Sequence, residues 1–347
     1  MAPPSHNHAP PSAIAEDWMR KLRKYCRPST ERSIIELMVT LLPFVAAWIV
    51  MVVAINLGHI WLSGLLLLPT SGLVVRLFMI QHDCGHGAFF PGRAANDWTG
   101  RVLGILTLTP YDYWRRTHAV HHATTGDLDS RGIGDVTTLT LREYLAGSFW
   151  RRLRYRLYRN PAIMFGIGPI YLFLFQYRLP FGLMRKRQFW VSTMATNLTI
   201  AATSSIMIWL CGFWPFILVH VPLVIVAASA GVWLFYVQHQ FEETQWSSAD
   251  SWNAHDAGLY GSSHYDLPGI LRWFTANIGV HHVHHLVSRI PFYRLPEVLR
   301  DYPELRDIGR LRLWQSFGCV RLVLWDEARQ RLISFRDLKV ARQSPCG

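Results

Sequence analysis

Hydrophobic positions are concentrated in four long runs, at residues 34–57, 60–80, 189–211 and 215–237, with polar sequence between the two pairs. At about 1.5 Å per residue, each run is long enough to cross about 30 Å of hydrocarbon as an α-helix. Two residues separate the first run from the second, and three separate the third from the fourth. The pattern therefore predicts four transmembrane helices arranged as two hairpins.

Two further segments are less regular. Residues 162–175 form an apolar run that contains Gly166, Gly168 and Pro169. A run of this length is more typical of an interfacial or re-entrant piece than of a span, and glycine and proline weaken a regular helix. Between residues 310 and 329, apolar and aromatic side chains alternate with arginines. This pattern is compatible with an amphipathic helix on the membrane or on the rest of the protein, or with an ordinary packing helix.

The composition agrees with a membrane protein and indicates its orientation. Of the 347 residues, 50% are hydrophobic and 17% are charged, whereas soluble domains carry about 25% charged residues. The net charge of +12 would fit a nucleic-acid-binding protein, but none of the 35 lysines and arginines lies in either hairpin turn. By the positive-inside rule, both termini and the long middle segment are cytosolic. We therefore expect no nucleic-acid partner.

Together these features predict an all-α integral membrane protein with a cytosolic helical cap. The five expected regions are a polar, disordered cytosolic tail (1–33), hairpin 1 (34–80), a cytosolic or interfacial region (81–188), hairpin 2 (189–237) and the cytosolic cap (238–347). The five cysteines are scattered and form no Cys-x-x-Cys pair, which argues against a zinc ribbon or a disulfide framework. A reducing compartment suits them, and we expect the bacterial cytoplasmic membrane.

Three histidine clusters flank the cytosolic ends of the predicted spans. One has the pattern His-x-x-x-His, and two contain His-x-x-His-His, which should occur by chance roughly 0.03 times in a chain of this composition. Residues three or four apart share one face of a helix, so paired imidazoles can bind a metal ion. The clusters are His82 and His86; His118, His121 and His122; and His281, His282, His284 and His285.

All three clusters follow an even number of membrane crossings, so they lie on one side of the membrane and can converge. Eight or nine imidazoles exceed what one ion can bind, since zinc takes four ligands and octahedral iron six, so two ions are implied. Neutral nitrogen ligands disfavour Mg²⁺ and Ca²⁺ and leave iron, zinc, copper or nickel. Nearby carboxylates are expected to accept the free imidazole N–H and fix the ring orientation. The candidates are Asp83, Asp127, Asp129, Glu242 and Glu243.

The order and spacing of these clusters around paired spans resemble the membrane fatty acid desaturase family. The stretches 82–89, 121–144, 238–242 and 261–295 are most similar to its omega-6, or Δ12-type, acyl-lipid members. The resemblance implies a non-haem centre of two iron ions that uses O₂ to introduce a cis double bond into a fatty acyl lipid. The implied ligands are His82, His86, His118, His121, His122, His281, His284 and His285, with His239 at the end of the fourth span as a ninth.

The chain departs from the family pattern in three places. Phe235 stands where stearoyl-type members have an asparagine, one helical turn before His239. The corresponding contact to the metal is therefore lost or supplied by another group. His264 replaces an expected tyrosine, and His282 makes the register of the third cluster ambiguous, although the family pattern favours His281.

The chain carries no fused electron donor, because it has no cysteine run for an iron–sulfur cluster and no cytochrome b5-like segment. An external ferredoxin or cytochrome b5-type partner is expected. The basic run 151–159 fits the docking of such an acidic protein, or attachment to anionic membrane lipids. Arg76, near the cytosolic end of its span, is expected to snorkel toward that face.

Two other functions stay open on the sequence. A lipid hydroxylase or a carotenoid ketolase of the same scaffold would use the same metals and differ in how the substrate is held. A divalent-metal transporter would need polar ligands near mid-membrane. The spans offer only Glu36, Arg76 and His220 as acidic, basic or histidine side chains, so the transporter is the weaker alternative.

Overall fold

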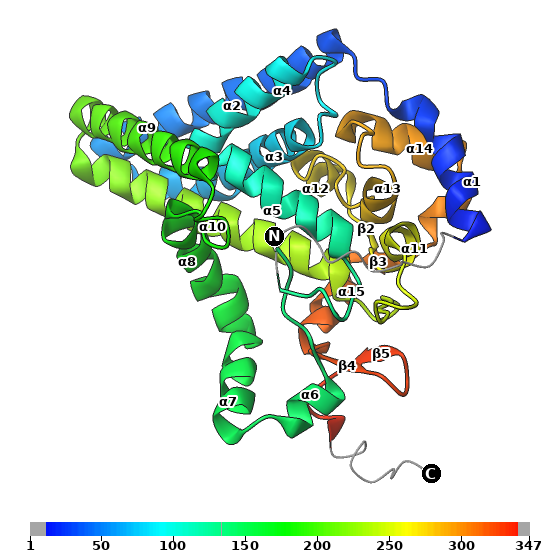
Figure 1. Cartoon of the computed structure of the whole chain (residues 1–347). Helices are drawn as coiled ribbons and strands as arrows, with labels where there is room; N and C mark the ends of the chain where they lie inside the picture. Colours follow the sequence, from blue (N-terminus) through cyan, green and yellow to red (C-terminus); the bar gives the residue numbers. More distant parts are fainter. Residues whose placement is uncertain (1–11, 133, 339–347) are drawn as a thin grey trace.

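The computed structural model describes residues 12–132 and 134–338, which fold mainly into helices (Figure 1). Among these residues, four helices are long and apolar enough to cross a membrane, and they match the predicted apolar runs to within a few residues. They are α2 (Thr30–Asn56), α3 (Ile60–Gly85), α9 (Arg187–Cys211) and α10 (Phe213–His239). The prediction of a mainly helical protein with four helices able to span a membrane is confirmed.

Short connections join these helices in sequence. Gly212 alone separates α9 from α10 and has a φ of +89°, a left-handed conformation that glycine adopts without strain. Helix α3 packs along both α2 and α10. Helix α9 is the least covered, because Phe189 and Thr193 are its only buried residues. The apolar side chains along the rest of α9 are suited to contact with lipid.

Arg76 and Glu36 form a buried ion pair between α3 and α2. Arg76 also donates to Thr40 Oγ1 at 3.1 Å and to the Trp273 carbonyl, and its guanidinium lies 4.3 Å from the centre of the Trp273 ring. The prediction that Arg76 snorkels is therefore wrong, because neighbouring groups satisfy the guanidinium inside the protein. The contacts of Arg76 with Trp273 also hold α12 (Gly269–Phe274) against α3.

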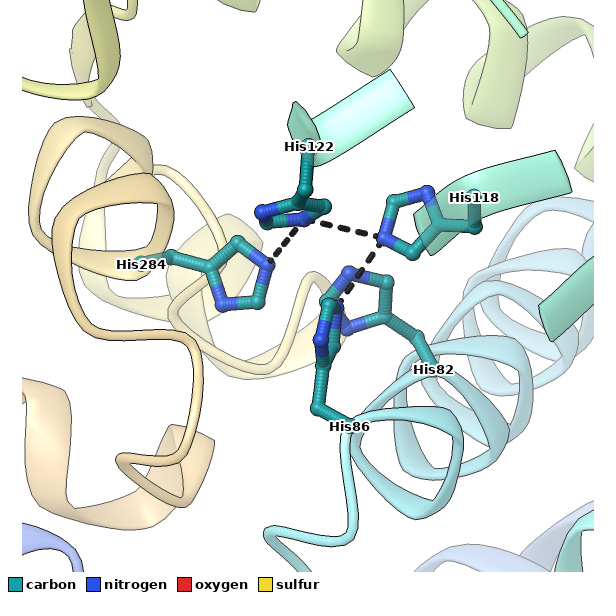
Figure 2. Close-up of side chains that lie close together, drawn as sticks. All are labelled: His82, His86, His118, His122 and His284. Atoms are coloured by element: carbon teal, nitrogen blue, oxygen red, sulfur yellow. Dashed lines mark hydrogen bonds between the residues drawn. The ribbon is translucent and has the colours of Figure 1, made fainter. Parts of the chain in front are cut away.

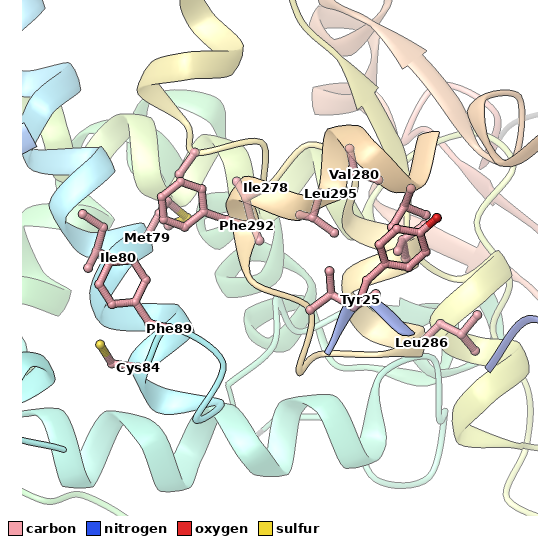
Figure 3. Close-up of a cluster of buried hydrophobic side chains, with 14 of the residues drawn as sticks. Tyr25, Met79, Ile80, Cys84, Phe89, Ile278, Val280, Leu286, Phe292 and Leu295 are labelled. Carbon is pink, nitrogen blue, oxygen red and sulfur yellow. The ribbon is translucent and has the colours of Figure 1, made fainter. Parts of the chain in front are cut away.

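Shorter helices surround the ends of α3 and α10 that carry histidines (Figure 1). Besides α12 they are α4 (Arg93–Leu106), α5 (Tyr111–Thr124), α11 (Ala254–Tyr260), α13 (His281–Leu286) and α14 (Leu295–Asp301). The main hydrophobic core joins the end of α3 to α13 and the segment after it, through Ile80, Phe89, Leu286 and Phe292 (Figure 3). Because these side chains are close-packed, the core fixes two histidine-bearing segments relative to each other.

The N-terminal segment is folded where the structure describes it. It forms α1 (Ala13–Leu22) and η1 (Arg23–Tyr25). Trp18 of α1 is buried and packs edge-on against Tyr302, with the ring centroids 5.4 Å apart. The predicted disordered tail is therefore wrong for these two helices, because Ala15, Trp18, Leu22 and Tyr25 are buried. Residues 1–11 lie outside the described residues.

The short apolar run at 162–175 forms no span. It is divided into the π-helix η2 (Ile163–Ile167) and α8 (Gly168–Leu174), and both pack on α10. It follows α6 (Leu141–Ala146) and α7 (Phe149–Tyr158). Several apolar side chains of this region stay exposed, among them Trp150 and Ile167.

The prediction of a helix near the C-terminus is correct only in part, because residues 313–321 are helical whereas residues 310–312 and 324–326 form strands. β3 (Arg310–Arg312) pairs in parallel with β2 (His264–Asp266), and Leu311 is buried between two exposed arginines. This alternation has the two-residue period of a strand. The remaining elements are α15 (Leu313–Ser316), η6 (Phe317–Arg321) and a small sheet of β1 (Leu139–Thr140), β4 (Leu324–Asp326) and β5 (Arg331–Ile333).

Candidate metal centre

The nine predicted histidines come from the ends of four helices. Because residues one turn apart share a helix face, each cluster directs several imidazoles to one side of its helix. His82 lies in the last turn of α3 and His86 is its C-cap; His118, His121 and His122 lie in the second half of α5; His239 ends α10; and His281, His284 and His285 belong to α13.

Five of these side chains converge on one point and form what we term the five-histidine group: His82, His86, His118, His122 and His284 (Figure 2). Each offers a ring nitrogen, and these nitrogens all lie within 4.8 Å of one another. The Nε2 atoms of His86 and His118 are 3.0 Å apart, and those of His122 and His284 are 3.2 Å apart. Trp114 stacks on His118 with the ring centroids 4.6 Å apart.

The other four side chains form a second set, the four-histidine group: His121, His239, His281 and His285. Its ring nitrogens also lie within 4.8 Å of one another, and Nε2 of His239 is 3.1 Å from Nε2 of His281. The rings of His122 and His285 stack at 4.0 Å between centroids. The two groups are therefore neighbours, and the arrangement suits two adjacent ions.

Asp135 supports the four-histidine group, and the sequence reasoning missed it. One carboxylate oxygen of Asp135 is hydrogen-bonded to Nδ1 of His121, which leaves Nε2 of His121 to face the group. Gly134, with a φ of +77°, brings this loop against α5: a Cβ at Gly134 would lie 3.2 Å from both the Thr117 carbonyl oxygen and the His121 Cβ. A glycine directly before an acid was the only signal in the sequence.

The five acids predicted to orient imidazoles differ in what they contact. Asp83 Oδ1 lies 3.3 Å from Nδ1 of His82, and its other oxygen accepts the Phe292 N–H at 2.7 Å.

The other four acids make no imidazole contact in the part of the chain that the structure describes, so the prediction needs correction there. Asp127 accepts the backbone N–H of Asp129, and Asp129 accepts that of Ala249, each at 2.9 Å. Glu242 and Glu243 are exposed. The backbone amides of the loop occupy the first two carboxylates, and solvent reaches the other two.

Burial favours the neutral form of six of the cluster imidazoles, which is the form that binds metal. Desolvation lowers the pKa well below its usual value, and neighbouring imidazoles add to the effect, at His86, His118, His122, His281, His284 and His285. The Nε2 atoms of His121 and His285 are buried without a hydrogen-bond partner among the described residues. Such groups are costly unless a ligand satisfies them. Two transition-metal ions fit these nitrogen atoms.

The structure separates the histidines of the third cluster. His282 binds the Leu305 carbonyl through Nε2 at 2.8 Å and packs near His264, away from both groups, whereas His281 belongs to the four-histidine group. The Phe235 ring lies 4.9 Å from that of His121. Phe235 therefore places an apolar ring beside the four-histidine group, at the position where stearoyl-type members of the family that the sequence resembles have an asparagine.

The chain is similar to known proteins over most of its length. The family model for fatty acid desaturases matches residues 59–317. A fatty acid desaturase of Bacillus subtilis is 39% identical over 321 residues, which is 92% of this chain and 90% of that protein. Two proteins of Synechocystis are also similar. An sn-1 acyl-lipid omega-3 desaturase (ferredoxin) is 28% identical over 70% of this chain and 68% of its own length. An sn-1 oleoyl-lipid 12-desaturase is 26% identical over 72% of this chain and 73% of its own length.

Proposed function

Because the chain belongs to the fatty acid desaturase family, we propose that it introduces a cis double bond of the omega-6, or Δ12, type into the acyl chain of a membrane lipid. The enzyme is an oxidoreductase. The proposed bond position draws on the 12-desaturases among its relatives.

The observation that carries the proposal is the pair of histidine groups. Segments more than 150 residues apart in the sequence contribute to each, and such convergence is expected when the side chains share ligands. We propose that each group holds one iron ion. The ligands would be His82, His86, His118, His122 and His284 for one ion, and His121, His239, His281 and His285 for the other.

Iron bound in this way would supply the capacity to activate O₂ with electrons from outside. The protein orients the ligands: Asp135 and Asp83 accept from His121 and His82 and so favour one tautomer of each ring. Trp114 and Phe235 lie against the imidazoles and keep water away from the site where an unactivated methylene must be held.

The remaining features of the proposal concern the membrane. α2 with α3, and α9 with α10, would form two transmembrane hairpins in the bacterial cytoplasmic membrane, with the histidine groups and both termini in the cytosol. A ferredoxin or a cytochrome b5-type protein would deliver the electrons. One relative is named as a ferredoxin-type enzyme, which supports the first choice.

The test is expression in a host that lacks polyunsaturated lipids, followed by location of any new double bond by mass spectrometry. We expect a dienoic acyl chain with its new bond at the Δ12 position, and no such product from a His284→Ala variant that accumulates in the membrane. A hydroxylated chain would indicate a hydroxylase of the same scaffold. Absence of any product when iron and a reductant are supplied would refute the proposed function.

A further inference from the structure

A cavity of about 260 Å³ lies in the cap beside the third histidine cluster. Gly279 and Val280, the two residues before His281, form part of its wall. None of the nine histidines of the two groups lines it. The cavity is therefore a separate feature that shares a backbone segment with the candidate metal centre.

Arginines dominate the charge of this cavity. Arg272, Arg306 and Arg310 line it together with one acid, Asp266. Arg310 is bound to Asp266 at 2.7 Å. Within the described residues, no carboxylate pairs with either Arg272 or Arg306.

Both of these arginines keep N–H groups available. Arg272 donates through Nε and one terminal nitrogen to the Leu267 carbonyl, at 3.4 and 3.2 Å. Arg306 donates through Nε to the Leu299 carbonyl at 3.0 Å. A guanidinium has five N–H donors, so each retains donors on its outer edge. The backbone contacts hold the two side chains at the cavity while leaving them able to bind an anion.

The cavity wall has an unusual backbone at Asn277 and the residue before it. Ala276 and Asn277 have φ values of +48° and +56°, and two successive non-glycine residues in the left-handed region are unfavourable. Asn277 lines the cavity and donates to the Phe292 carbonyl at 3.2 Å. Strained conformations of this kind persist where the surrounding structure holds them, and they concentrate at functional sites.

The cavity lies beside a helix that packs on a candidate membrane span. Arg272 belongs to α12, which Arg76 holds against the candidate span α3 through the Trp273 carbonyl. The Phe274 ring of α12 also packs closely on Gly72 of α3, where an added Cβ would lie 2.7 Å from the ring. Ile270 and Trp273 on α12 are 70% and 39% exposed. An apolar surface next to a span and a cationic cavity thus occur on one short helix.

We propose that this cavity binds the phosphate group of a membrane phospholipid, with Arg272 and Arg306 donating to the phosphate oxygens and the exposed face of α12 in contact with the acyl chains. Guanidinium groups match phosphate oxygens in geometry and charge. The volume suits a headgroup rather than a whole lipid. The site goes beyond the proposed function, because binding needs neither iron nor turnover.

The first experiment uses the purified full-length protein in detergent and labels arginines with phenylglyoxal, read by peptide mass spectrometry. Phosphatidylglycerol should protect Arg272 and Arg306. A glycosyl diacylglycerol with the same acyl chains, which lacks phosphate, should not. Arg142, on α6 and away from the cavity, has a side chain that is 84% exposed and should be labelled equally in both lipids.

Other outcomes overturn the proposal. Equal protection by the phosphate-free lipid would show that the phosphate is not recognised. Protection by inorganic phosphate at the concentration at which the phospholipid acts would point to a free-phosphate site instead. Protection by an acidic electron-transfer protein alone would identify a docking surface for that protein.

The second experiment compares variants by native mass spectrometry of retained phospholipid. Arg272→Gln and Arg306→Gln should each weaken phosphatidylglycerol binding about tenfold, because each removes charge-assisted hydrogen bonds. Arg306→Lys should recover part of the binding, and the control Arg142→Gln should leave it unchanged. Unchanged phosphatidylglycerol binding in both glutamine variants would refute the site. If a variant fails to fold, the phenylglyoxal labelling of the unmodified protein decides.

Discussion

Replacing Asp135 by asparagine should release one of the two proposed iron ions. Asp135 is hydrogen-bonded to Nδ1 of His121, and the two side chains are only 9% and 1% exposed. Water therefore screens the contact little. The substitution keeps the volume of the side chain but removes the negative charge that orients the imidazole and raises its basicity as a ligand.

The magnitude follows from the role of such contacts. Loss of a carboxylate that supports a metal-bound histidine lowers metal affinity about 10–100-fold, or about 1.4–2.7 kcal/mol. Among the described residues, the side chain of Asp135 is hydrogen-bonded to His121 of the four-histidine group alone, so the five-histidine group should keep its ion. Iron content should therefore fall from two toward one per chain as a chelator is added, at a chelator concentration that leaves the unmodified protein loaded.

The matched control is Asp129→Asn. Asp129 lies in the same loop region and accepts the Ala249 N–H at 2.9 Å, so its replacement should leave the iron content unchanged. Iron per chain is measured by elemental mass spectrometry after dialysis against graded chelator. If Asp135→Asn retains both ions as firmly as the unmodified protein, or if Asp129→Asn loses iron equally, the assigned role of Asp135 is wrong.

Three further outcomes are expected. His284→Ala should abolish both iron binding in the five-histidine group and product formation, and full activity of this variant would contradict the ligand assignment. His282→Ala should keep the metal and only lower the melting temperature, since His282 binds the Leu305 carbonyl. Arg76→Met should destabilise the fold by about 1–3 kcal/mol, because it removes one of the two arginines paired with the buried Glu36 while Arg32 keeps its contact at 2.6 Å. Glu36→Gln in the same chain should restore part of the loss, as read from thermal unfolding. The metal-free protein should lose stability as the pH falls below about 6.5, because burial lowers the pKa of His282 to about 3. Between about pH 6.5 and about pH 3 the unfolded chain takes up a proton at His282 and the folded chain does not, so equal melting temperatures at about pH 7 and about pH 5 would contradict this.

Much of the fold could be predicted from the sequence, because membrane-spanning helices depend on local apolar runs. The second predicted span, 60–80, coincides with the start of α3, which continues to Gly85 because the first histidine cluster extends the helix beyond the apolar residues. The clusters themselves have helical spacing. That spacing identifies the three clusters, whereas the resemblance to the desaturase family supplies His239 and favours His281 over His282.

The errors concern contacts between distant segments. Asp127 and Asp129 were chosen because they are close in sequence to the second cluster, but a glycine turn brings Asp135 to His121 instead. The sequence does not predict α1, because its few apolar residues pack on a distant segment: Trp18 contacts Tyr302. Arg76 looked exposed because nothing local predicts its pairing with Glu36 from the preceding span.

The central claim is that the two histidine groups hold two iron ions side by side. Iron K-edge X-ray absorption of the purified, iron-loaded protein, combined with metal analysis, tests it most directly. The account predicts two iron atoms per chain, with ligands that are predominantly imidazole nitrogen and with a second iron nearby. A folded protein that binds one iron or none, or whose iron is held mainly by carboxylate oxygens, would contradict it.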